Sequence, residues 1–96
     1  LTHKLEGEEL RTFLTQVPNW ENYYDRQILR HWSFIDFQRP LKFANAVAEI
    51  AEQEGHHPNI EFGWGYVRIV IWTHAINGLS KNDFILAAKI DAIVTG

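Results

Sequence analysis

Two hydrophobic periods run along this chain, and each predicts one kind of secondary structure. Near the start, apolar side chains fall at i, i+3, i+4 and i+7, namely Leu10, Phe13, Leu14 and Val17. This spacing places them on one face of an amphipathic helix. Pro18 comes next and cannot continue a helix, so we expect the helix to end there.

The helical period is clearest in the middle of the chain. Asp36 is a suitable N-cap for this segment, Pro40 fits its first turn, and Gly55 provides a C-terminal stop. We therefore expect a helix between Asp36 and Gly55. Its buried stripe consists of Phe43, Ala46, Val47, Ile50 and Ala51.

A third helix is predicted near the C-terminus. Ser80 can cap it, and Asp83, three residues later, can return the hydrogen bond in a variant of the capping box. Leu79 and Phe84 occupy the positions of a hydrophobic staple. The predicted buried stripe consists of Leu86, Ile90, Ile93 and Val94.

Alternation of apolar and polar residues predicts strands in the remaining segments. One pair covers residues 20–24 and 27–35, and a second pair covers residues 60–64 and 66–74. His74 is then the last residue of its strand. One face of that strand consists of Val67, Ile69 and Ile71.

The order of these elements is αββαββα. Pairs of strands with helices between them indicate an α+β fold, in which a four-stranded antiparallel sheet carries the helices on one face. The chain has 96 residues, which suits one compact domain. We therefore expect a single domain over residues 1–96.

Composition excludes several classes of function. The formal net charge is −3 and no basic run is present, so nucleic acid is not an expected partner, because that binding depends on clustered Lys and Arg. No apolar stretch approaches the roughly 20 residues that cross a membrane, and nothing resembles a signal peptide. The absence of cysteine excludes disulfides and thiolate-bound metals. These features are compatible with a cytoplasmic protein, which we expect.

Aromatic residues are abundant for such a small chain. It contains four tryptophans, three tyrosines and six phenylalanines, more than one small core readily buries. Some of them are expected at a subunit interface or in a ligand pocket. Because a chain this small has no disulfides to stabilise it, oligomerisation is favoured. Trp20, Trp64 and Trp72 can stack on a flat heterocycle, although packing in a core or interface is the default for tryptophan.

Three of the five histidines are the candidate catalytic residues. His56 and His57 follow Gly55 and precede Pro58, so both imidazoles lie on a segment held between a helix and a strand. His74 meets them if its strand crosses nearby. Imidazole titrates near pH 6.5, so such a cluster can protonate a leaving group and remove a proton from the same substrate.

Other interpretations of these residues remain open. His56 and His57 can be loop histidines that make structural hydrogen bonds, and the cap of the last helix is enough to explain Asp83. The three histidines, with Glu52 or Glu61, can also offer ligands to zinc. No HExxH-type pair is present to strengthen that interpretation.

Several of these residues belong to one spaced motif. It reads Glu52-Gln-Glu-Gly-His56-His57-Pro58, then Trp64, then Thr73-His74, then Gly78-Leu79-Ser80 and Asp83. Together with Trp20 and the stretch 34–37, this motif resembles the pterin-4a-carbinolamine dehydratase family. The resemblance covers nearly the whole chain.

The resemblance implies a function and an assembly. Such proteins remove water from 4a-hydroxytetrahydropterin to give quinonoid dihydropterin, which recycles the cofactor of aromatic amino-acid hydroxylases. They have the αββαββα fold, form dimers or tetramers, and need neither a metal nor an organic cofactor. A non-catalytic interaction module is the alternative, since some members bind transcription factors or assist other assemblies.

The resemblance also implies roles for individual residues. By position, His56 and His74 match the acid–base histidines of the family, and His57 matches the histidine that holds the substrate. One departure is Asn82, where many members have an arginine. The remaining positions implied to lie at the substrate are Glu52, Trp20, Thr73 and Asp83.

Overall fold

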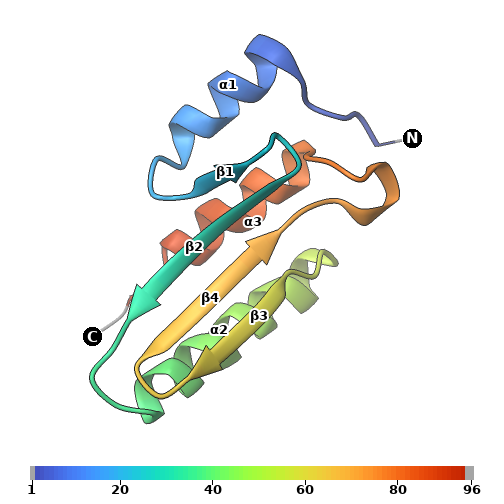
Figure 1. Ribbon diagram of the computed structural model, residues 1–96. Helices are drawn as coiled ribbons and strands as arrows, with labels where there is room; N and C mark the ends of the chain where they lie inside the picture. The colour runs from blue at the N-terminus through green and yellow to red at the C-terminus, as the bar shows by residue number, and fades with distance from the viewer. Residues whose placement is uncertain (1, 95–96) are drawn as a thin grey trace.

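One antiparallel sheet forms the centre of the computed structural model, which describes residues 2–94 (Figure 1). Its strands lie in the order β1-β2-β4-β3. Their bounds are β1 (Glu21–Tyr23), β2 (Gln27–Ser33), β3 (Asn59–Gly63) and β4 (Tyr66–Ile71). The helices are α1 (Gly7–Gln16), α2 (Gln38–Glu54) and α3 (Lys81–Asp91), with a 3-10 helix, η1 (His74–Ile76), before α3. The predicted α+β fold, αββαββα with a four-stranded antiparallel sheet, is confirmed.

The helices cover one face of the sheet, and no helix of the described residues lies on the other face. Figure 1 shows α2 and α3 behind the sheet and α1 near its β1 edge. Val67, Ile69 and Ile71 of the central strand β4 are fully buried on the covered face, as their alternation predicts. Trp32 of β2 packs on Phe43 of α2, with ring centroids 4.8 Å apart.

Local signals set the ends of two helices as predicted. Gly55 ends α2 with a φ of 64°, a left-handed conformation that glycine adopts without steric cost. The predicted N-cap Asp36 is one residue too early: Phe37 holds the cap position of α2, although the Asp36 carboxylate still accepts a hydrogen bond from the backbone N–H of Arg39. The capping box of Ser80 and Asp83 is present at the start of α3.

Other sequence expectations are wrong at segment ends. Strand β4 ends at Ile71, so His74 does not end a strand but begins η1. The chain turns there because Thr73 pairs with Gly78 in an isolated bridge. Val94 is 91% exposed because α3 stops at Asp91, which leaves Val94 on no buried helical face. In the same way, β2 ends at Ser33, before the predicted residue 35.

The hairpin between β1 and β2 is tight. Tyr24 and Asp25 have φ values of 51° and 60°, and the N–H of Arg26 donates to the Tyr23 carbonyl over 2.9 Å. Positive φ at both central residues gives a turn whose twist matches that of the strands. Asn22 supports the turn through hydrogen bonds to both the Asp25 side chain and its backbone N–H.

Candidate active site

A buried carboxylate, that of Asp83, lies at the centre of the candidate site. Asp83 is fully buried in the first turn of α3. Its Oδ2 accepts hydrogen bonds from the Ser80 N–H and from the Thr73 hydroxyl, each over 2.8 Å. Because Thr73 gives its only hydroxyl proton to Asp83, the Ser80 hydroxyl must donate to Thr73 Oγ1, 2.7 Å away. The network therefore ties α3 to the turn that follows β4.

The other oxygen of this carboxylate binds the first candidate histidine. His56 Nε2 lies 2.5 Å from Asp83 Oδ1, and the His56 side chain is only 18% exposed. An ionised carboxylate only accepts hydrogen bonds, so Nε2 must carry the hydrogen. In the neutral ring, Nδ1 is then the nitrogen with a free lone pair. The contact with Asp83 thus assigns the tautomer of His56 and leaves Nδ1 able to accept a proton.

The second candidate histidine has a different surrounding. His57 Nε2 is hydrogen-bonded to the Glu52 carboxylate in the last turn of α2. Both side chains are largely exposed to solvent. The adjacent imidazoles therefore bind separate carboxylates, one buried and one exposed. Their different roles stay a prediction, and the structure shows that their surroundings differ.

The third histidine stacks on a tryptophan. The His74 ring lies 4.1 Å from the Trp72 ring, centroid to centroid, with 19° between the planes. Trp72 is half-buried and His74 is exposed, so one face of the imidazole is covered and the other faces solvent. Within residues 2–94, no hydrogen bond joins the His74 side chain to His56 or His57.

The pairing of β3 with β4 brings the histidine-bearing segments to the same end of the sheet. Asn59 pairs with Val70, and the strands are antiparallel. The chain before Asn59 and the chain after Val70 therefore leave the sheet at the same end. The shared contact with Asp83 joins His56 to Thr73, the residue before His74.

Trp20 lies away from the candidate histidines. Its side chain is 5% exposed, and its indole N–H donates to Asp91 over 2.8 Å. Asp91 is the last residue of α3, whereas Asp83 lies in the first turn. At 1.5 Å per residue, the two carboxylates are about 12 Å apart along the helix axis. The structure therefore does not bring Trp20 to His56.

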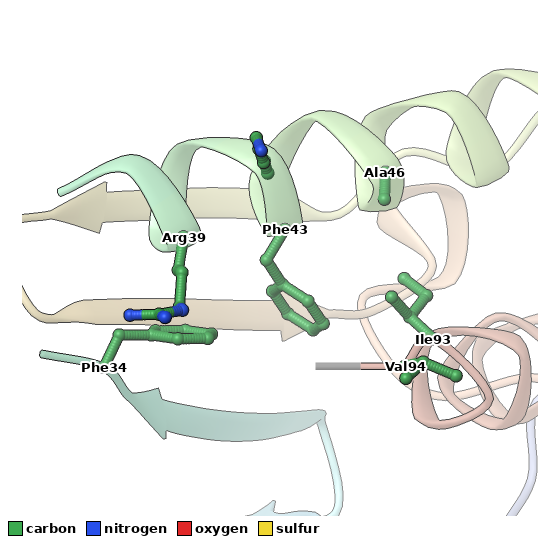
Figure 2. A pocket seen from close by; sticks show the side chains of 7 residues that line it. Phe34, Arg39, Phe43, Ala46, Ile93 and Val94 are labelled. Carbon is green, nitrogen blue, oxygen red and sulfur yellow. The ribbon is translucent and has the colours of Figure 1, made fainter. Parts of the chain in front are cut away.

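A hollow at the other end of α2 contains none of the predicted site residues. Figure 2 shows this hollow, which has a volume of about 170 Å³. It lies between the first half of α2 and the end of the described chain. Its lining residues are Phe34, Arg39, Lys42, Phe43, Ala46, Ile93 and Val94.

The predicted alternative of a zinc site lacks a ligand cluster in the described part of the chain. No three side chains of His, Asp or Glu among residues 2–94 are grouped so that they could hold a metal ion. The candidate zinc ligands instead make pairwise contacts, His56 with Asp83 and His57 with Glu52.

No helix among residues 2–94 is long and apolar enough to span a membrane.

Two contacts in the candidate site were missed from the sequence. The capping pattern predicted the hydrogen bond that Asp83 Oδ2 accepts from Ser80. It gave no indication that Asp83 Oδ1 binds His56. The sequence separation of 27 residues between the two partners leaves no local signal for it. The stacking of Trp72 on His74 was missed because His74 was placed in a strand, whereas the turn after Ile71 brings the rings together.

Comparisons with known proteins agree with the motif. The family described as pterin 4 alpha carbinolamine dehydratase matches residues 3–93. A protein of Rubrobacter xylanophilus, provisionally named pterin-4-alpha-carbinolamine dehydratase, is 44% identical over 89 residues, which are 93% of this chain and 83% of the relative. A protein of Methylococcus capsulatus with the same provisional name is 47% identical over 90 residues, covering 93% and 79% of the two chains.

Two solved structures are similar to this fold. One is a transcriptional coactivator/pterin dehydratase from Brucella melitensis, with a TM-score of 0.88 and 28% identity, covering 98% of this chain and all of that one. The other is a pterin dehydratase-like protein identified as a RuBisCO assembly factor in the alpha-carboxysome. It has a TM-score of 0.65 and 26% identity, covering 77% and 87% of the two chains.

Proposed function

The chain belongs to the pterin 4 alpha carbinolamine dehydratase family, and we propose that it removes water from a 4a-hydroxytetrahydropterin to give the quinonoid dihydropterin. The observation that carries the proposal is the buried contact between Asp83 and His56. It leaves His56 Nδ1 with a free lone pair beside the segment that bears His74. A positioned base and a second imidazole are what this dehydration requires.

The reaction needs two proton transfers. The substrate carries a hydroxyl group on C4a and a hydrogen on the neighbouring N5. Hydroxide is a poor leaving group, so an acid must protonate the oxygen while the C4a–O bond breaks. The lone pair of N5 forms the new C4a=N5 double bond as the C4a–O bond breaks, and the N5 proton then goes to a base, which leaves the N–H bonding pair on N5. Positioned acid–base catalysis of this kind contributes about 10²–10⁴-fold.

We assign the base to His56 and the acid to His74. When Nδ1 of His56 takes the N5 proton, the ring becomes an imidazolium whose Nε2–H still donates to Asp83. The buried carboxylate stabilises that charge, as the aspartate does in a serine-protease triad. His74 gives its proton to the departing oxygen, and exchange with solvent returns both rings to their starting states. His57, held by Glu52, hydrogen-bonds the pterin ring.

Dehydration rates of histidine variants test this proposal. The substrate is freshly generated 4a-hydroxytetrahydropterin in a buffer of low general-base strength. We expect His56→Ala and His74→Ala each to lower the enzymatic rate about 100-fold or more. The control is His3→Ala, because His3 is exposed and its one side-chain partner among residues 2–94 is Glu9. Undiminished rates in both site variants would refute the proposed mechanism. A wild-type protein that does not accelerate dehydration would refute the proposed function.

We also propose that the chain acts as a homodimer or homotetramer. Ile35 and Trp64 are 79% and 70% exposed, and the partly exposed rings of Phe37 and Phe62 contact each other at a centroid distance of 5.9 Å. Exposed apolar side chains gathered at one end of a sheet are typical of an interface. Sedimentation equilibrium measures the assembly, and a monomer at micromolar concentration would refute this part of the proposal.

A protein-binding role is a second candidate function. The similar structures include a protein described as a transcriptional coactivator and one described as an assembly factor. The same exposed end of the sheet can serve such a role in this chain. The dehydration assay separates the two candidates, because a pure interaction module gives no acceleration over the uncatalysed reaction.

A further inference from the structure

The hollow between the first half of α2 and the end of the described chain is separate from the candidate active site (Figure 2). Arg39 and Lys42 line it, whereas Glu52, which binds His57, lies in the last turn of α2. At 1.5 Å per residue, Arg39 and Glu52 are about 20 Å apart along the helix axis. A small molecule in this hollow therefore does not reach the candidate histidines.

The inner wall of the hollow is apolar and contains two aromatic rings. Phe34 and Phe43 contact each other, with ring centroids 6.0 Å apart and 48° between the planes. Figure 2 shows Phe43 and Ile93 pointing toward the same space, one from α2 and the other from the segment after α3. The volume of the hollow is about 170 Å³. An apolar cavity of about 150 Å³ holds a benzene ring, so this hollow has room for one six-membered ring.

Two cationic side chains lie on the α2 side of the hollow. Arg39 and Lys42 are three residues apart, which makes them neighbours on the helix surface, and both are exposed at the rim. Arg39 Nη1 donates to Asp36 Oδ2 over 2.9 Å, which leaves its other N–H donors available. Lys42 forms no ion pair or side-chain hydrogen bond with any residue of the range 2–94. Even with Asp36 counted, the rim keeps one positive charge in a chain whose net charge is −3.

We infer that this hollow binds a small aromatic carboxylate, with its ring against Phe34 and Phe43 and its carboxylate at Arg39 and Lys42. A guanidinium forms paired, charge-assisted hydrogen bonds with a carboxylate, and an ammonium adds another. The ring of the ligand leaves water and gains tilted contacts with the two phenylalanine rings. A neutral aromatic molecule lacks the first interaction and an inorganic anion lacks the second. The inference does not depend on the proposed function.

An NMR titration of the full chain with benzoate, benzamide and inorganic phosphate tests the inference. The backbone amide shifts report which residues each compound contacts. For benzoate we expect a dissociation constant on the order of 1 mM, given so few ligand atoms, and the largest shifts at residues 42–46 and 93–94. Benzamide has the same shape without the charge, so its dissociation constant should be about 5- to 10-fold higher. Phosphate should not saturate the site in this concentration range.

Two variants separate the charged rim from the apolar interior. Lys42→Gln removes the charge and should raise the dissociation constant of benzoate about three- to fivefold, while that of benzamide stays within about twofold. Ala46→Leu fills part of the hollow and should weaken both compounds more than about 10-fold, because little free volume then remains. The matched control is Lys81→Gln, the same change at an exposed lysine at the other end of α3 from the hollow.

Several results would overturn the inference. Equal affinities for benzoate and benzamide, or an unchanged benzoate affinity in Lys42→Gln, would show that the charge is not recognised. Phosphate binding as tight as that of benzoate would show that the ring is not recognised. Benzoate shifts confined to the segments of His56 and His74 would place the ligand in the candidate active site. No shifts at about ten times the expected dissociation constant would show that the hollow is closed or covered by another subunit. If Ala46→Leu does not fold, Lys42→Gln decides alone.

Discussion

The change Asp83→Asn tests whether the buried carboxylate controls the chemistry of His56. Asparagine has the same shape as aspartate but carries one acceptor and one donor group. The amide oxygen can keep the hydrogen bonds from Ser80 and Thr73, both 2.8 Å long in the native protein. The amide NH₂ then faces His56 Nε2. To accept that hydrogen bond, His56 must carry its own hydrogen on Nδ1.

The structure allows the size of both effects to be estimated. The three native contacts are nearly retained, so we expect the free energy of unfolding to fall by only about 1–2 kcal/mol, the difference between a charged and a neutral hydrogen-bond acceptor. The activity should respond far more. With Nδ1 protonated and no carboxylate to stabilise an imidazolium, the base is lost, which predicts a fall in kcat of about 10²–10⁴-fold.

Three measurements check this reasoning. Urea unfolding followed by tryptophan fluorescence gives the stability, the dehydration assay gives kcat, and ¹⁵N NMR of the imidazole ring gives the tautomer of His56. The control is Asp91→Asn, the same change at the other end of α3, where the carboxylate binds Trp20 and no histidine. A wild-type rate in Asp83→Asn, or a His56 ring that keeps its hydrogen on Nε2, would refute the role assigned to the carboxylate.

The remaining predictions concern single contacts. Trp72→Leu removes the ring stacked on His74, so kcat should fall about threefold to tenfold, and Trp72→Phe should restore it. Gly55→Ala puts a Cβ at a φ of 64° with no other heavy atom within 4 Å, so urea unfolding should show a loss of about 1–2 kcal/mol, and no loss would contradict the left-handed cap. Hydrogen bonds, first from Asn22 and then from a guanidinium, lower the pKa of Asp25 below its ordinary 3.8. Its contribution to stability is therefore present above pH 3.8 and lost as the pH falls through the lowered pKa, and an NMR titration midpoint at or above 3.8 would contradict this.

The sequence predicted the elements because their signals are local. The capping box of Ser80 and Asp83 spans three residues, and the left-handed stop at Gly55 needs only that residue. The alternation that buries Val67 and Ile69 depends on a period of two residues. The spaced histidine motif could likewise be read along the chain, and it agrees with the family match over residues 3–93.

Errors arose where a local pattern ran past the end of its element. Apolar character continues from Ile71 through Trp72, so the strand was expected to include His74. The bridge between Thr73 and Gly78 bends the chain there instead. Val94 likewise continues the helical spacing of α3 but lies beyond its last turn and is exposed.

Local sequence and tertiary packing therefore determined different features of this protein. The sequence by itself determined the order of helices and strands, the caps, and which residue types could transfer protons, because those depend on neighbours along the chain. Only the tertiary structure decided that Asp83 binds His56 across 27 residues and that Trp20 binds Asp91 across 71. Such contacts depend on how the elements pack and on the register between β3 and β4. Neither the packing nor the register is encoded by any single stretch of the chain.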